Sequence, residues 1–176
     1  MTLDATPAGA AADSYLTVAA ADALAGEDLG PERDAWLKAD VETKERALQR
    51  ATREVDAYVA TGWPQYDGAQ ALVFPREIDV DAGGDPIIPR KVVLATYQQA
   101  LYVLKNRDAL AAMNAHRAAG GTVDPDAAYS VDPQNGPAVI SPMAMHYLAG
   151  FRTAPRISKG GSVRSARVRS GFIGAG

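Results

Sequence analysis

The sequence contains no cysteine. Disulfide bonds, thiolate zinc sites and cysteine nucleophiles are therefore excluded, and a small secreted scaffold is not expected. Only two histidines are present, His116 and His146, and they lie too far apart to suggest a metal centre. No apolar run approaches the roughly 18 residues of a membrane span, and the N-terminus lacks the pattern of a signal peptide. We expect a soluble intracellular protein, or part of a particle assembled inside a cell, with no membrane contact.

Recognisable catalytic motifs are also missing. No serine stands in a Gly-x-Ser-x-Gly setting, and no glycine run has the order of a phosphate-binding loop. The acidic stretch at residues 79–85 departs from a calcium-binding loop, because its fifth and twelfth positions are Gly83 and Arg90 instead of ligands. We therefore expect no enzymatic activity, no metal and no other cofactor.

Acidic residues are absent from the end of the chain. Residues 151–176 hold six basic residues and no acid, whereas residues 1–150 hold 12 basic residues and all 21 acids. The chain of 176 residues, with a net charge of -3, thus divides into a body of charge -9 and a tail of charge +6. Such asymmetry is typical of an interaction segment. The basic residues of the tail are Arg152, Arg156, Lys159, Arg164, Arg167 and Arg169.

The tail cannot form a core of its own, because it is rich in glycine, serine and arginine. It ends with an apolar pair, Phe172 and Ile173, set between glycines. Two interpretations stay open. The tail is either a disordered basic segment or a docking arm, in which the basic side chains contact an acidic partner and Phe172 and Ile173 enter a pocket as an anchor.

Hydrophobic periodicity indicates a mainly helical protein. The clearest helix follows Asp40, a good N-cap, because apolar residues then recur at the three- and four-residue spacing of one buried face. Thr17 and Ser141 are N-caps of two shorter helices, and Pro89 suits the first turn of another. The charged residues 27–38 read as a loop or a broken turn. We expect a small bundle of three to four helices with long loops and a minor β-hairpin near Asn135.

These features divide the chain into three regions. Residues 1–12 are small and offer nothing to bury, so we expect a flexible N-terminal arm. Residues 13–150 form the helical body, and residues 151–176 form an extended C-terminal arm.

The helix that begins at Pro89 is apolar on more than one face. A helix of this kind is buried in a larger protein or packed against a neighbouring subunit. For a chain of this length we favour packing between subunits. The residues expected to make that contact are Val92, Val93, Tyr97, Leu101 and Leu104.

Aromatic residues in and after the loop at 63–88 invite comparison with base-stacking platforms. Such platforms need a basic groove beside them, yet residues 63–85 contain one arginine and five acids. We therefore favour a packing role over a stacking role for these aromatics. The residues concerned are Trp63, Tyr66, Phe74 and Tyr97.

The order of several short motifs resembles a known family, the head–tail connector adaptors of long-tailed bacteriophages and related gene-transfer particles. Some of its members are labelled DnaT-like single-stranded-DNA-binding proteins. The resemblance covers roughly residues 12–110. It rests on ADSYLTVAAAD at 12–22, ERALQRATREVD at 45–56, GWP at 62–64, QALVFPR at 70–76 and IPRKVVLA at 88–95.

The resemblance implies a structural adaptor in the neck of a virion, assembled in the host cytoplasm. It implies a homo-oligomeric ring, expected to have 12 copies, that joins the portal to stopper or tail-completion proteins. Double-stranded DNA would pass through the ring without sequence-specific binding, and the basic tail would dock on the portal. It also implies a structural signature that fixes the long loop to the helices, formed by Trp63, Pro64, Phe74, Pro75 and Arg76. The alternative function is single-stranded DNA binding through the basic tail.

Overall fold

The computed structural model describes residues 3–59, 63–107 and 140–151, and this part of the chain is mainly helical, as predicted. It has no strands, only isolated antiparallel bridges between Gln65 and Arg76 and between Val80 and Pro86. The C-terminal arm and the hairpin expected near Asn135 lie outside the described residues. The helices are α1 (Val18–Glu27), α2 (Arg33–Lys38), α3 (Val41–Tyr58), α4 (Arg90–Lys105) and α6 (Pro142–Leu148), and a 3-10 turn, η1 (Ala149–Phe151), follows α6.

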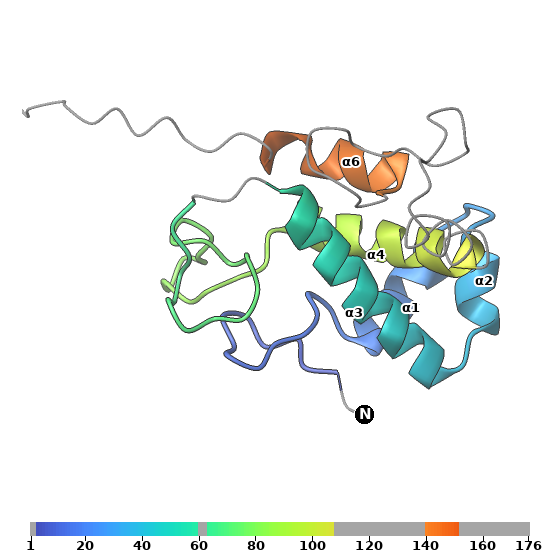
Figure 1. Ribbon diagram of the computed structural model, residues 1–176, viewed down its shortest axis with the longest axis horizontal. Helices are drawn as coiled ribbons and strands as arrows, with labels where there is room; N and C mark the ends of the chain where they lie inside the picture. The colour runs from blue at the N-terminus through green and yellow to red at the C-terminus, as the bar shows by residue number, and fades with distance from the viewer. Residues whose placement is uncertain (1–2, 60–62, 108–139, 152–176) are drawn as a thin grey trace, which may run out of the picture.

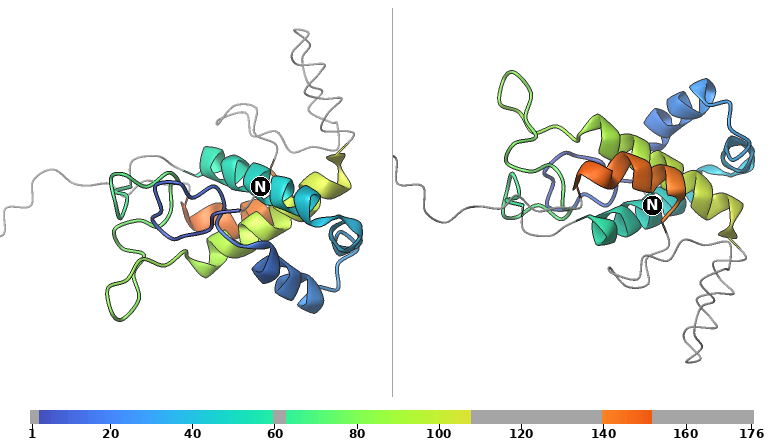
Figure 2. Two further views of the ribbon diagram at one scale, coloured as in Figure 1. Left: turned by 90° about the horizontal axis from the view of Figure 1, so that it is seen from below. Right: turned by 90° about the horizontal axis from the view of Figure 1, so that it is seen from above.

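Helix α4 lies at the centre of this arrangement. It packs against α3, α6 and α2, while α1 packs against α3 and α2 (Figure 1). The loop between α3 and α4 lies at the opposite end of the molecule from α2 (Figure 2). The core is therefore built mainly where α3, α4 and α6 meet, and the long loop closes one end of it.

Helix α3 forms where the periodicity predicts it. The Asp40 carboxylate accepts a hydrogen bond from the Thr43 backbone N–H at 2.7 Å, which satisfies a donor at the start of the helix. The apolar face points inward, and Leu48 and Val55 are completely buried. The arginines and glutamates of α3 are thereby left mainly on its other side.

The apolar surface of α4 is accounted for within the chain itself. Val92, Tyr97 and Leu101 are at most 2% exposed, because α4 has neighbouring helices on several sides. Val93 and Leu104 are half-buried and pack against the same core. Burial inside one chain explains these residues without a second subunit, and contact between subunits stays a prediction.

Residues 33–38, expected to be part of a loop or broken turn, form helix α2. The reason is tertiary packing, because the Trp36 side chain is completely buried against the Tyr97 ring, with ring centroids 6.4 Å apart. Its indole N–H donates to Asp22 of α1 at 2.8 Å. A short polar segment is thus held in helical form by one anchored aromatic side chain.

The N-terminal segment also differs from the flexible arm that its composition suggests. Residues 3–12 fold back onto the body, where the Asp13 backbone N–H donates to the Asp4 carbonyl oxygen at 2.9 Å. The Ala71 N–H donates to the Gly9 carbonyl oxygen at 3.1 Å, and Ala12 is buried. Small side chains allow this close approach of backbone to backbone, so the segment gains hydrogen bonds although it buries little apolar surface.

Helix α6 begins as predicted, with Ser141 as N-cap and Pro142 in the first turn. The Ser141 hydroxyl accepts from the Ala144 N–H at 3.0 Å. The Ser141 backbone N–H donates to the Gln99 side-chain oxygen at 2.7 Å, and the Gln99 amide donates to Glu54 at 2.6 Å. One buried glutamine of α4 therefore joins α3 to the start of α6.

Candidate nucleic-acid interface

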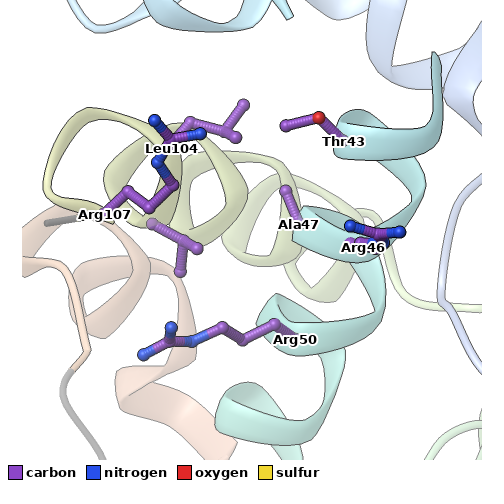
Figure 3. Close-up of a pocket in the computed structure, with 7 residues that line it drawn as sticks. Thr43, Arg46, Ala47, Arg50, Leu104 and Arg107 are labelled. Atoms are coloured by element: carbon purple, nitrogen blue, oxygen red, sulfur yellow. The ribbon is translucent and has the colours of Figure 1, made fainter. Parts of the chain in front are cut away.

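A groove lined by arginines lies between α3 and the C-terminal end of α4. Its volume is about 210 Å³. Figure 3 shows the Arg50 and Arg107 side chains extending from opposite sides of this space. The groove combines cationic groups with an apolar floor, and none of the described residues that line it is acidic. The lining residues are Thr43, Arg46, Ala47, Arg50, Val103, Leu104 and Arg107.

The helical repeat places two of the arginines on one face. Arg46 and Arg50 are four residues apart in α3, so their side chains emerge one above the other. Arg107 follows the C-cap of α4, Asn106, and approaches from the other side. A cluster of cations is therefore formed from two segments that are distant in sequence.

The α3 arginines are paired with glutamates one turn away. Arg46 pairs with Glu42, and both side chains are largely exposed, at 72% and 67%. Arg50 Nε lies 2.9 Å from Glu54, which the amide of Gln99 also contacts. Exposed pairs of this type contribute only about 0.3–0.5 kcal/mol, and a guanidinium has five N–H donors. Both arginines thus have donors beyond those that the pairs use, and the Arg46 pair can be exchanged for a phosphate at small cost.

A second cluster surrounds Arg76 in the loop between α3 and α4. Its guanidinium carbon lies 4.5 Å from the Trp63 ring centroid, 4.3 Å from that of Phe74 and 4.9 Å from that of Phe151. Arg76 is 2% exposed, and burial lowers its pKa although the charge of Asp79 opposes the shift. Four of the five signature residues thus take part in this corner of the loop, since Pro75 is also buried there.

The loop is fixed to the helices by a hydrogen-bonded network. Asp56 of α3 accepts from the Tyr15 hydroxyl and from the Val73 backbone N–H, the latter at 3.3 Å. The Phe74 N–H donates to the same hydroxyl at 3.1 Å, and the Tyr15 and Phe74 rings meet edge to face. Burial raises the pKa of Asp56 to about 6, against the lowering effect of these hydrogen bonds.

The other sequence-predicted groups fall in different places. Phe74 and Tyr97 are buried and Tyr66 is 40% exposed. The acidic stretch at residues 79–85 forms a turn, in which the Gly84 N–H donates to the Asp81 carbonyl oxygen at 3.1 Å and Gly84 has a positive φ of 90°. The six basic residues of the tail, together with Phe172 and Ile173, lie outside the described residues.

Among the residues with described positions, no three His, Asp or Glu side chains gather closely enough to hold a metal ion. None of the described helices is long and apolar enough to cross a membrane.

Residues 1–168 match a protein family described as "Putative DnaT-like ssDNA binding protein". The chain belongs to this family. A search of the curated proteins and a search of the solved structures each gave no match. The DnaT-like match spans the helical body together with most of the basic tail, so it covers both candidate contact regions.

Membership of the DnaT-like family overturns the function that we expected first. The resemblance implied a head–tail adaptor in the neck of a virion, whereas the matched family is described by binding of single-stranded DNA. The adaptor function is therefore wrong, and so is the description of the chain as a virion connector. The alternative stated for the sequence, single-stranded DNA binding, has the support of the match. Self-association in a ring is tested by neither the match nor the structure.

Sequence reasoning missed the arginine groove. Arg46 and Arg50 were visible as a pair spaced four residues apart on one helical face, which is a usable signal. Arg107 could not be added to them, because only the packing of α4 on α3 brings it near. The sequence also drew attention to the tail, whose charge is far more conspicuous than that of three arginines scattered among acids.

Proposed function

We propose that this protein binds single-stranded DNA through the arginine groove between α3 and α4, assisted by the basic tail. The observation that carries the proposal is a groove lined by three arginines in a chain of the DnaT-like family. Contact with phosphates is the main sequence-independent source of affinity for nucleic acid. The proposal is one of binding, without catalysis.

The local charge of the groove matters more than the net charge of the chain. The body is acidic overall, so a DNA strand is repelled by most of its surface. At physiological salt the screening length is about 8 Å, and acids beyond that distance have little effect on a phosphate held in the groove. Glu42 and Glu54 lie within that distance, because they pair with Arg46 and Arg50, so a phosphate competes with them for the arginine donors. Binding is therefore expected where cations outnumber the nearby acids, which are the groove and the tail.

The tail adds six positive charges to the same chain without any acid. A segment of this composition contacts phosphates without a fixed geometry. The groove then supplies a fixed contact and the tail supplies further charge, so we expect both to contribute to the salt dependence of binding.

The groove is tested by removing its charges while keeping the length of the side chains. In a chain with Arg46→Gln, Arg50→Gln and Arg107→Gln, binding of a fluorescent oligothymidylate of about 20 nucleotides is followed by anisotropy at several salt concentrations. Each phosphate contact in a single strand contributes about 0.7 to the slope of log K against log salt. Loss of three contacts is expected to flatten that slope by about 2.

The matched control is Arg90→Gln. Arg90 is an exposed arginine at the other end of α4 and does not line the groove, so its loss is expected to leave the slope nearly unchanged. An unchanged slope in the triple variant would show that the groove is not the contact. Failure of the unmodified chain to bind the oligonucleotide would show that the proposed function is wrong.

A further inference from the structure

Trp63 lies in the loop that follows α3, with its ring over the Arg76 guanidinium at 4.5 Å. Its side chain is only half-buried, whereas Phe74, which also contacts Arg76, is 1% exposed. A cation held against one face of an indole ring attracts it through the ring quadrupole. Trp63 is therefore an aromatic group that is held in place by Arg76 and still reaches solvent.

The charge of Arg76 is not neutralised by an ion pair. Within the described part of the chain, no carboxylate lies within ion-pair distance of its guanidinium, and its Nε and Nη2 atoms have no hydrogen-bond partner. The nearby Asp79 carboxylate instead accepts from the Arg76 backbone N–H at 2.9 Å. A positive charge buried beneath the Trp63 ring thus lacks a direct counter-charge, and it favours an anion nearby because low-dielectric surroundings screen it weakly.

Phe151, the residue before the basic tail, also lies at this place. Phe151 of η1 lies 4.9 Å from the Arg76 guanidinium carbon and packs edge to face on Phe74, with centroids 5.2 Å apart. Arg152, the first basic residue of the tail, is bonded directly to Phe151. The acidity of residues 63–85 is offset at Trp63 by the charge of Arg76, which lies against the Trp63 ring and is in no ion pair among the described residues.

We propose that Trp63 is a stacking platform for one base of the bound strand, with Arg76 as its positioning residue. This inference rests on the proposed function, single-stranded DNA binding. Aromatic rings beside a basic segment hold unpaired bases in this way, because every base has a flat face that can stack. Trp36, Phe74 and Tyr97 cannot take the role, since each is at most 2% exposed.

Tryptophan emission provides a direct test, because the chain has only two tryptophans and Trp36 is completely buried. Titration of the full chain with an oligothymidylate of about 20 nucleotides is expected to quench the emission of Trp63. An oligonucleotide of the same length without bases is the matched control, since it keeps the phosphates and has nothing to stack. It is expected to leave the emission unchanged.

Substitution of Trp63 gives a second and independent reading. Trp63→Ala is expected to weaken binding of the oligothymidylate by roughly 5- to 150-fold, the cost of losing one stacked base. Trp63→Phe keeps an aromatic face over Arg76 and is expected to retain most of the affinity, which guards against an effect of misfolding.

The outcomes separate the two proposals. If the full chain binds the oligothymidylate but its emission does not change, and Trp63→Ala binds as tightly as the unmodified chain, the stacking inference is overturned while the proposed function stands. If the full chain does not bind at all, both are overturned. Quenching by the oligonucleotide without bases would also overturn the stacking inference.

Discussion

At the scale of single residues, Asp56 shows how one buried carboxyl can join three parts of the chain. Its partners are the Tyr15 hydroxyl from the N-terminal segment and the Val73 N–H from the long loop, and it stands near the C-terminal end of α3 itself. The negative end of the helix dipole is an unfavourable place for a carboxylate. The Asp56 carboxyl and its hydrogen bonds therefore stabilise the fold best when Asp56 is protonated.

This arrangement predicts a dependence of stability on pH. Burial raises the pKa of Asp56 from 3.8 to about 6 in the folded chain. Between these values the folded state binds more protons than the unfolded state, so this residue makes stability fall as pH rises from about 4 to 6. The free energy of unfolding is expected to fall by about 2–3 kcal/mol over this range, because each pKa unit corresponds to about 1.36 kcal/mol.

The measurement is urea unfolding of the unmodified chain and of Asp56→Asn at pH values from 4 to 7. Other carboxyls, such as Asp22 beside Lys44, have lowered pKa values and act in the opposite direction. These carboxyls are present in both proteins, so their effects cancel in the difference between the two free energies of unfolding. The unmodified chain should lose stability relative to Asp56→Asn as pH rises, and a difference that stays constant with pH would contradict this account.

At the scale of elements, one buried polar side chain adds hydrogen bonds to the apolar contacts between α3, α4 and α6. The Gln99 oxygen accepts from the Ser141 N–H at 2.7 Å and its amide donates to Glu54 at 2.6 Å. Gln99 itself is completely buried. A buried polar group that loses its partner costs about 1–3 kcal/mol, so this glutamine stabilises the start of α6 and the face of α3 together.

Truncation of this side chain should therefore be costly. Gln99→Ala leaves the Ser141 N–H without its partner and removes one donor from Glu54, and we expect a loss of about 2–4 kcal/mol in the free energy of unfolding, measured in urea. The neighbouring Gln98 is half-buried and makes a long contact of 3.4 Å with Asp28. Gln98→Ala is the control and should cost less than about 1 kcal/mol. Equal losses in the two variants would show that the network does not join the helices.

The helices were predictable where local chemistry specifies them. Asp40 and Ser141 cap α3 and α6 as their sequences indicate, because a capping side chain acts on N–H groups only two or three residues away. Helix α2 was not predictable in this way, since its formation depends on the burial of Trp36 among residues from other elements. The same reason hid the candidate site, because Arg107 and Phe151 reach their partners only through tertiary packing.

At the scale of the whole molecule, the net charge is divided unevenly along the chain. The body of residues 1–150 carries a net charge of -9 and the tail carries +6. In the proposed function the acidic body restricts phosphate contact to the arginine groove and to the tail. In this proposal, the charge division that first suggested an interaction segment becomes a means of directing where a DNA strand lies.

The most direct test of this account is the affinity of the full chain for a labelled single strand, measured across a range of salt concentrations. Binding is predicted to be saturable and to weaken steeply with salt. Replacing the six basic residues of the tail by glutamine is predicted to lower the slope of log K against log salt by up to about 4. No saturable binding at low salt, or binding that does not respond to salt, would contradict the claim that this protein binds single-stranded DNA.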